Sequence, residues 1–342
     1  MSMLRAITKI VTLYLGLPKD IYVVALAEFV LALGRFVFPF LSLLLTQKLG
    51  LSAMQAGVWV TVVALSSLPG SFVGGKLSDH FSRKLIIIIG QACAVVTMVV
   101  CGFFATSFAI LPLVFIAGFA MGVAMPAVRA LIVDLSTPEN RDAAMSLSYL
   151  AFNMGFAIGP LLAGFLFAHH THWLFWLDGF ATFVSMLLII CCLSGRYVIE
   201  AKSELEQAVT GSVWSVLWQR PHLILYTIIC TLLSLAIAQF FFAIPLYLAD
   251  VFKGHGAEHY GQVMTINAAV VVIFTPIFTA LTRRYSALVG TIIAAAFFML
   301  VLQHVALEPE FDGDISGRFF YDGGGDFDCN KKQCFYCQSL TE

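Results

Sequence analysis

The chain has 342 residues, of which 60% are hydrophobic and only 11% are charged, and its formal net charge is −1. Soluble domains carry about 25% charged residues, so this composition excludes an ordinary water-soluble domain and predicts an all-α polytopic protein embedded in a lipid bilayer. A net charge so close to zero gives no electrostatic basis for binding nucleic acid.

The N-terminal segment, residues 1–21, is the first predicted element. Apolar residues recur at helical spacing over residues 3–17, with basic and hydroxyl side chains between them, and Pro18 follows. The pattern predicts a short amphipathic helix on the cytoplasmic membrane surface, with an unstructured leader as the alternative.

Nine apolar runs follow, each long enough to cross the hydrocarbon core of a bilayer as a helix. They lie at residues 22–46, 54–75, 85–106, 108–133, 144–168, 173–194, 222–248, 260–281 and 286–307. Lys and Arg gather in alternate connections, on the side that holds the N-terminus. This asymmetry predicts a cytoplasmic N-terminus in a plasma membrane of bacterial type.

The polar stretch 195–221 divides these runs into two groups. It is predicted to be a cytoplasmic linker between a six-helix bundle, residues 22–194, and a partial second bundle of three helices, residues 222–307. The tail, residues 308–342, is polar and changes abruptly in composition. Such a change is typical of a truncated or out-of-frame end, and a genuine divergent tail is the alternative.

The connection between the second and third runs reads G-K-L-S-D-H-F-S-R-K. Five of its positions match, in residue type and spacing, the loop signature of the major facilitator superfamily: Gly75, Leu77, Asp79, Arg83 and Lys84. His80 and Ser82 replace the Arg and Gly that are usual there. The chain resembles this superfamily, and the resemblance implies two related helix bundles around a central cavity and transport by alternating access.

The end of the fourth run, from Pro126 to Arg141, resembles the matching region of bacterial multidrug exporters. That resemblance implies that Asp134 faces Asp79 and Arg83, and that the three charges form a latch for the outward-facing state. The alternative is that the basic residues of the loop only fix its topology.

Four charged residues fall inside the predicted spans, where each costs roughly 2.5–3.5 kcal/mol to insert. They are Glu28, Arg35, Arg129 and Asp178. Glu28 and Arg35 are about two turns apart and should share one face of the first helix. The superfamily fold lines its cavity with the first and fourth helices, so we expect Glu28 and Arg35 to border the cavity. Glu28 and Arg129, at similar depth, are expected to pair across it in at least one state and to take part in proton coupling. Separate snorkelling to the interface is the alternative. Asp178 is expected to be a helix-end charge rather than a transport residue.

The two predicted bundles show signs of an internal repeat. One constant offset places Gly50 on Gly254, Gly57 on Gly261 and Arg35 on Gln239. Glycine pairs at loop ends are unusual chance matches in so apolar a chain. Gln239 is therefore the candidate cavity residue of the second bundle.

The fifth run carries N-M-G-F-A-I-G-P-L-L-A-G, which resembles the signature of the antiporter branch of the superfamily. Gly155 and Gly159 are one turn apart and favour close helix packing, Pro160 is expected to bend the helix, and Gly164 completes the pattern. Exporters of this type often carry an Arg in the middle of the fourth helix, and this chain has none in F-I-A-G-F-A-M-G.

No motif for enzyme chemistry, a metal or a cofactor is found in the sequence. His169, His170 and His172 predict a solvated turn, since no carboxylate or Cys lies close by. The resemblance implies proton-coupled efflux of drugs or other amphipathic small molecules, so the expected partners are a small-molecule substrate and protons. A carrier for a specific metabolite and a truncated, non-transporting membrane fragment are the alternatives.

Overall fold

The computed structural model describes residues 14–193 and 221–282, and every regular element in these two segments is helical. The elements are α2 (Lys19–Leu33), α3 (Val37–Leu43), the π-helical turn η1 (Leu44–Lys48), α4 (Ala53–His80), α5 (Arg83–Phe103), α6 (Ile110–Asp134), α7 (Arg141–His169), α8 (Thr171–Cys192), α10 (Pro221–Val251) and α11 (Gly256–Thr282). The prediction of an all-α protein is confirmed. Residues 1–13, most of the predicted linker, the ninth span at 286–307 and the tail lie outside the described residues.

Six helical segments of the described chain are long and apolar enough to cross a membrane. They are Lys19–Lys48, Ala53–His80, Arg83–Phe103, Ile110–Asp134, Arg141–His169 and Thr171–Cys192. These segments match the first six predicted apolar runs, because hydropathy and length alone specify a span. Polar residues at the ends fix the exact limits. At the start of α4, for example, Ser52 and Gln55 form a reciprocal capping box, with hydrogen bonds of 3.3 Å and 3.1 Å between side chain and backbone.

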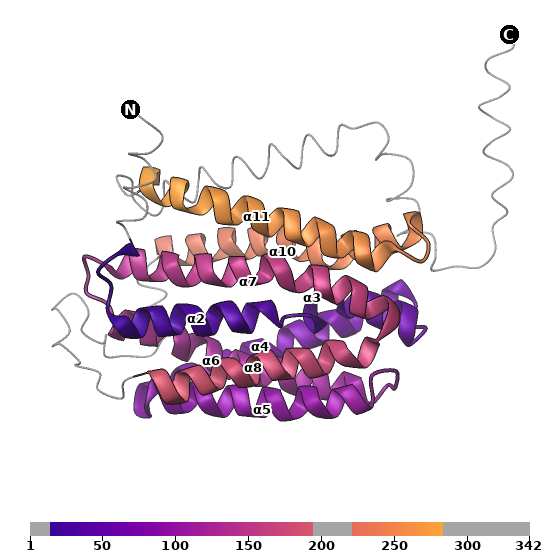
Figure 1. Cartoon of the computed structure of the whole chain (residues 1–342), viewed down its shortest axis with the longest axis horizontal. Helices are drawn as coiled ribbons and strands as arrows, with labels where there is room; N and C mark the ends of the chain where they lie inside the picture. The colour runs from indigo at the N-terminus through magenta and orange to yellow at the C-terminus, as the bar shows by residue number, and fades with distance from the viewer. Residues whose placement is uncertain (1–13, 194–220, 283–342) are drawn as a thin grey trace, which may run out of the picture. The chain divides into compact units, whose positions relative to one another are not determined.

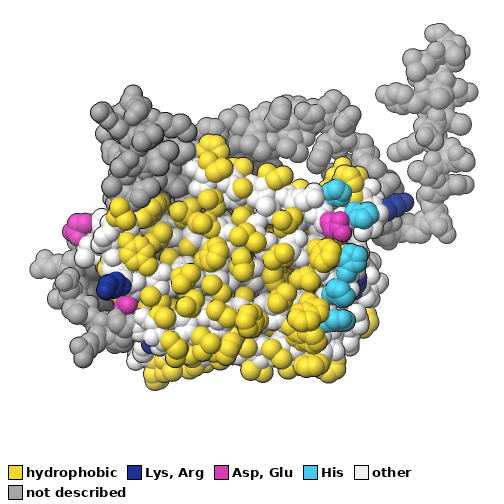
Figure 2. Space-filling view, in the orientation of Figure 1, with side chains coloured by type: hydrophobic (Ala, Val, Ile, Leu, Met, Phe, Trp, Pro, Cys, Tyr) yellow, Lys and Arg dark blue, Asp and Glu magenta, His cyan; other side chains and the backbone are white. Residues whose placement is uncertain are grey.

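The helices lie side by side along a common direction (Figure 1). We call the end with the α4–α5 connection the Arg83 end and the end with the α7–α8 connection the His169 end. Helix α6 packs between α4 and α5, α8 packs on α5 and α2, and α7 joins α2 to α11. A broad hydrophobic surface lies between the two ends, and the charged and histidine side chains gather at the ends (Figure 2). This distribution is the one expected of a bundle surrounded by lipid.

Glycines allow α4 and α6 to touch backbone to backbone. A Cβ atom at Gly74 would lie 2.2 Å from the carbonyl oxygen of Val123, and one at Gly70 would lie 2.3 Å from that of Phe119. The arrangement is reciprocal, since a Cβ atom at Gly122 would meet the Ser67 carbonyl at 2.5 Å. Small residues at such contacts are the usual basis of helix association in membranes.

The first span is not one continuous helix, as its apolar run predicts. Residues 34–36 are not helical and separate α2 from α3. Glu28 and Arg35 therefore do not share one face of a single helix, and the expectation that they do is wrong. The run of apolar residues gives no sign of the break, where Gly34 lies against another helix, α8.

The predicted loop between the second and third spans is also shorter than expected. Helix α4 continues through Gly75 to His80, and α5 begins at Arg83, so only two residues, Phe81 and Ser82, connect the helices. Most of the loop signature therefore lies in the last two turns of α4. The polarity of this stretch suggests a loop, but a helix that projects beyond the hydrocarbon core can be polar at its end.

Candidate functional site

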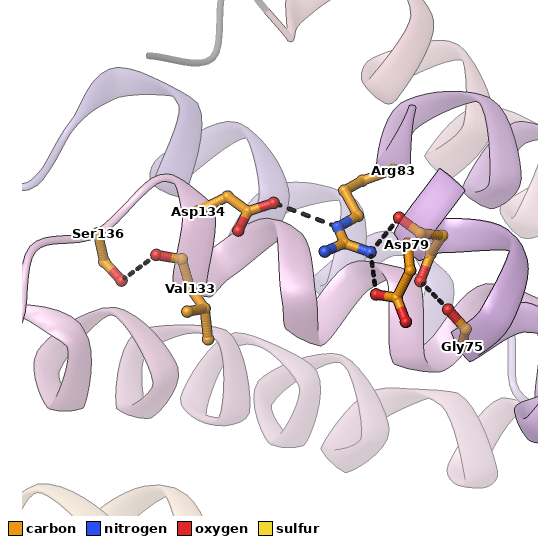
Figure 3. A network of polar contacts seen from close by, with 7 residues as sticks. Gly75, Asp79, Arg83, Val133, Asp134 and Ser136 are labelled. Carbon is orange, nitrogen blue, oxygen red and sulfur yellow. Dashed lines mark hydrogen bonds and ion pairs between the residues drawn. The ribbon is translucent and has the colours of Figure 1, made fainter. Parts of the chain in front are cut away.

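Arg83 lies between two carboxylates at the Arg83 end of the bundle (Figure 3). Its Nη1 atom is 3.2 Å from Asp79 Oδ1, and its Nε atom is 3.2 Å from Asp134 Oδ2. Nη1 also donates a hydrogen bond to the carbonyl oxygen of Ser78. We call Asp79, Arg83 and Asp134 the Arg83 cluster. The cluster joins the ends of α4, α5 and α6.

The two ion pairs of the Arg83 cluster differ in burial. The Arg83 side chain is 19% exposed, the Asp134 side chain 31% and the Asp79 side chain 70%. Exposed ion pairs contribute only about 0.2–1 kcal/mol, and water weakens the pair with Asp79 most. The bridge from α5 to α6 through Asp134 is therefore the stronger of the two. Asp79 and Arg83 are four residues apart across the α4–α5 connection, whereas Asp134 comes from a distant part of the sequence.

The other residues of the loop signature lie apart from the two carboxylates. Nothing lies within 4 Å of a Cβ atom placed at Gly75, and Leu77 is exposed. Lys84 Nζ donates hydrogen bonds to the carbonyl oxygens of Ile190 (2.9 Å) and Leu193 (3.0 Å) at the end of α8. Lys84 thus satisfies carbonyl groups that the end of a helix leaves unpaired and places a positive charge at the negative end of its dipole.

The predicted pair of Glu28 and Arg129 is not formed in this structure. Glu28 is 8% exposed, whereas Arg129 is exposed. Within the described chain, Glu28 forms no ion pair with Arg129 or Arg35, although the charges of both arginines act on its carboxyl group. Arg35 is partly buried, and its guanidinium carbon lies 5.7 Å from the ring centroid of Phe152, which is cation–π geometry. Glu28 is thus a buried acid near two positive charges.

The glycines of the predicted antiporter motif face two different helices. Cβ atoms at Gly155 and Gly159 would lie 2.2 Å and 2.6 Å from backbone carbonyl oxygens of α2. A Cβ atom at Gly164 would lie 2.6 Å from the Ala257 carbonyl of α11. In return, one at Gly261 would lie 2.5 Å from the carbonyl of Pro160, a residue within the continuous helix α7. The motif therefore holds α7 against the first span and against the second half of the chain.

Two further predicted sites are placed only in part. Gln239 is within α10, but its side chain lies outside the described residues. His169 ends α7 and His172 lies in the first turn of α8, so the predicted turn is only the single residue His170. No group of three or more potential ligands is arranged to hold a metal ion in the described segments.

Asp178 is a buried acid and not the helix-end charge that its sequence position suggests. It lies two turns into α8 and is 7% exposed. Its Oδ2 atom accepts a hydrogen bond of 3.3 Å from the backbone N–H of Val37, the first residue of α3. A hydropathy profile does not reveal that a carboxylate accepts a hydrogen bond from the backbone of another helix. The cost of a carboxylate inside a span was the available signal.

Comparison with known proteins connects this geometry to a family. The sequence profile of the Major Facilitator Superfamily matches residues 24–308. The uncharacterized MFS-type transporter YqjV of Bacillus subtilis is 26% identical over 257 residues, which are 73% of this chain and 61% of that protein. The quinolone resistance protein NorA of Staphylococcus aureus is 30% identical over 239 residues, which are 68% of this chain and 59% of NorA. The chain thus spans less than two thirds of either relative's length.

Solved structures show the same fold at lower sequence identity. The peptide transporter POT in complex with sulfate superimposes with a TM-score of 0.52 at 14% identity, over 79% of this chain and 70% of that one. A complex of the same transporter with alafosfalin gives a TM-score of 0.52 at 16% identity, over 80% of this chain and 70% of that one.

Proposed function

Since this chain belongs to the Major Facilitator Superfamily, we propose that it is a membrane transporter that exports amphipathic small molecules in exchange for protons. Similarity to a protein named for resistance to quinolones supports drug-like substrates. The glycines that hold α7 against α2 and α11 match the pattern of the antiporter branch and support proton exchange.

The observation that carries the mechanism is the position of Arg83 between carboxylates of two other helices. Alternating access requires contacts that form in one state and break in the other, and ion pairs at helix ends are suited to this. A cluster of this exposure contributes about 1 kcal/mol, which changes a two-state population several-fold without locking it. The Arg83 cluster is therefore proposed as a conformational latch.

Glu28 is the proposed proton carrier. It is buried within the first span, and the charges of Arg35 and Arg129 act on it. A carboxyl group in this setting can release its proton when a cation approaches and take one up when the cation leaves. Arg129 is exposed in this structure, and its approach to Glu28 in another state is part of the proposal.

The Arg83 end is proposed to face the cytoplasm. Positively charged residues of the described chain are concentrated there: Lys19, Lys76, Arg83, Lys84 and Arg141. Lys48 and Lys253 are the corresponding residues near the His169 end. Short loops rich in Lys and Arg remain on the cytoplasmic side of plasma membranes.

Transport by everted membrane vesicles tests this proposal. A fluorescent quinolone should accumulate in energised vesicles, an uncoupler that collapses the proton gradient should release it, and Arg83→Ala should reduce the initial rate. Lys253→Ala, a change of an exposed basic residue at the opposite end, serves as the matched control. Competition by chemically unrelated compounds supports a drug exporter, competition by close analogues of one metabolite indicates a specific carrier, and absence of any uptake contradicts the proposal.

A further inference from the structure

The break in the first span lies directly on α8. A Cβ atom at Gly34 would be 2.1 Å from the Cβ atom of Ala181 and 3.3 Å from the carbonyl oxygen of Leu177. These two residues of α8 flank Asp178 in sequence. Only glycine fits at position 34 while the break keeps its contact with α8.

The backbone donors of the break can be accounted for one by one. Gly34 N–H bonds to the Val30 carbonyl at 3.3 Å, Arg35 N–H to that of Ala32 at 3.1 Å, and Phe36 N–H to that of Gly34 at 2.8 Å. The next donor, the Val37 N–H, bonds to the carboxylate of Asp178 at 3.3 Å. No water is available at membrane depth to replace such a partner. Asp178 therefore supplies the acceptor that the interrupted helix lacks.

Arg35 and Asp178 also border the same small cavity. Its lining comprises Leu31, Arg35, Phe38, Ala94, Met98, Met121, Asp178 and Thr182. Arg35 and Asp178 are the charged members of this set, and Arg35 extends toward the Phe152 ring of α7. Arg35, at the interruption of the helix, thus lies between Asp178 of α8 and Phe152 of α7.

We propose that Asp178 is a positioning residue of the transport site, which holds the first span broken at residues 34–36 and thereby presents Arg35 to the substrate. In the broken span, Arg35 borders the cavity and lies against the Phe152 ring. The presentation of Arg35 to a substrate rests on the proposed function, whereas the role of Asp178 at the break does not.

Hydrogen–deuterium exchange of the purified chain tests the break without any transport. Asp178→Ala removes a hydrogen bond to a charged group, so the amides of residues 34–38 should exchange roughly tenfold faster or more. Ser185→Ala is the matched control, because it removes a buried hydrogen bond of 3.2 Å between α8 and Gln91 of α5, away from the break. It should leave residues 34–38 unchanged. Unchanged or slower exchange in Asp178→Ala overturns the proposal.

A second variant covers the case in which Asp178→Ala does not fold. Gly34→Ala pushes the break away from Ala181 and loosens the same contact from the other side. It should also accelerate exchange over residues 34–38, and unchanged exchange in this variant overturns the proposal equally.

A double-mutant cycle tests the link to Arg35. With a fluorescent quinolone as the transported probe, Arg35→Ala and Asp178→Ala should each raise KM, and the double variant should be no worse than Arg35→Ala alone. If the two effects multiply, Asp178 acts apart from Arg35 and the positioning role is overturned. If the unaltered protein transports no probe, the proposed function fails, while the exchange experiment still decides the role of Asp178.

Discussion

At the scale of single residues, both ion pairs of the Arg83 cluster depend on the planar guanidinium group of Arg83. Its Nε and Nη1 atoms reach carboxylates of two different elements at once. Lysine carries a compact charge that cannot occupy both positions. We expect Arg83→Lys to lower the initial rate of export roughly fivefold, equivalent to about 1 kcal/mol, with unchanged amounts of protein in the membrane. Export at the normal rate in this variant would contradict the latch.

The two carboxylates of the Arg83 cluster should differ in importance. Asp134 is 31% exposed and Asp79 is 70% exposed, so water competes more strongly for the second ion pair. We expect Asp134→Asn to lower the export rate more than Asp79→Asn does, as measured side by side in the same vesicles. Equal losses of export rate in the two variants would show that burial does not determine how much each ion pair contributes.

Glu28 gives a prediction about coupling rather than rate alone. Glu28→Gln keeps the size and polarity of the side chain but cannot carry a proton. We expect the variant to bind a quinolone but to export it without dependence on the pH gradient, and to show no substrate-induced proton release in vesicles. Glu258→Gln, at the start of α11, is the matched control, and it should behave as the unaltered protein does. Preserved coupling in Glu28→Gln would exclude the proposed role.

At the scale of elements, two neighbouring glycines of α4 differ in their role: one packs against α6, and the other belongs to the loop signature and touches no other helix. A Cβ atom at Gly74 would be 2.2 Å from the Val123 carbonyl, whereas one at Gly75 meets nothing within 4 Å. We expect Gly74→Ala to destabilise the bundle by about 1–3 kcal/mol through overpacking. Gly75→Ala should leave stability unchanged or raise it by up to about 1 kcal/mol, since alanine is the better helix former. Thermal unfolding of the two variants in detergent makes this comparison, and an equal loss in both would contradict the packing argument.

The sequence predicts elements better than their interruptions and contacts. Hydropathy locates the six spans because each is a local property of about 20 residues. The break at residues 34–36 is hidden, since it depends on Asp178, which is far away in the sequence. Spacing alone allows Asp79 and Arg83 to meet, but Asp134 joins them only through the packing of α4, α5 and α6. Gly70 and Gly74, which make the closest contacts of α4, carry no signal that distinguishes them from Gly75.

At the scale of the whole described bundle, the two halves of the chain meet at the His169 end. The described buried residues of α11 all lie in its first half, from Gly256 to Ala268, and none of the described residues from Ala269 to Thr275 is buried. The hydrophobic cluster at the His169 end includes Tyr260 and Met264 of α11, whereas the cluster at the Arg83 end has its described members in the first half of the chain, on and beside α2, α5, α6, α7 and α8. The Arg83 cluster is intact while the opposite end of the bundle is packed, so in this structure the cluster is not confined to the outward-facing state that the resemblance implies.

Tyr260 gives a prediction for that packed end. Its ring lies 5.1 Å from that of Phe40 in edge-on geometry, and its buried hydroxyl has no hydrogen-bond partner among the described residues. Removing an unsatisfied buried hydroxyl is stabilising, so we expect Tyr260→Phe to raise the unfolding midpoint in detergent by about 2 °C or more. Tyr149→Phe, a change at a tyrosine that is 53% exposed, is the control and should leave the midpoint unchanged. A lower midpoint in Tyr260→Phe would reveal a partner for the hydroxyl.

The length of α4 has a consequence for where the latch operates. Its 28 residues extend about 42 Å, roughly 12 Å more than the hydrocarbon core of a bilayer. The last turn of α4, with Asp79, therefore reaches the headgroup and aqueous layer, where dissolved ions weaken the attraction between exposed charges. Ionic strength on this one face of the membrane should then set how long the Arg83 cluster stays closed. The salt concentration in the adjoining compartment would thus influence the proposed transport without any ion binding to a specific site.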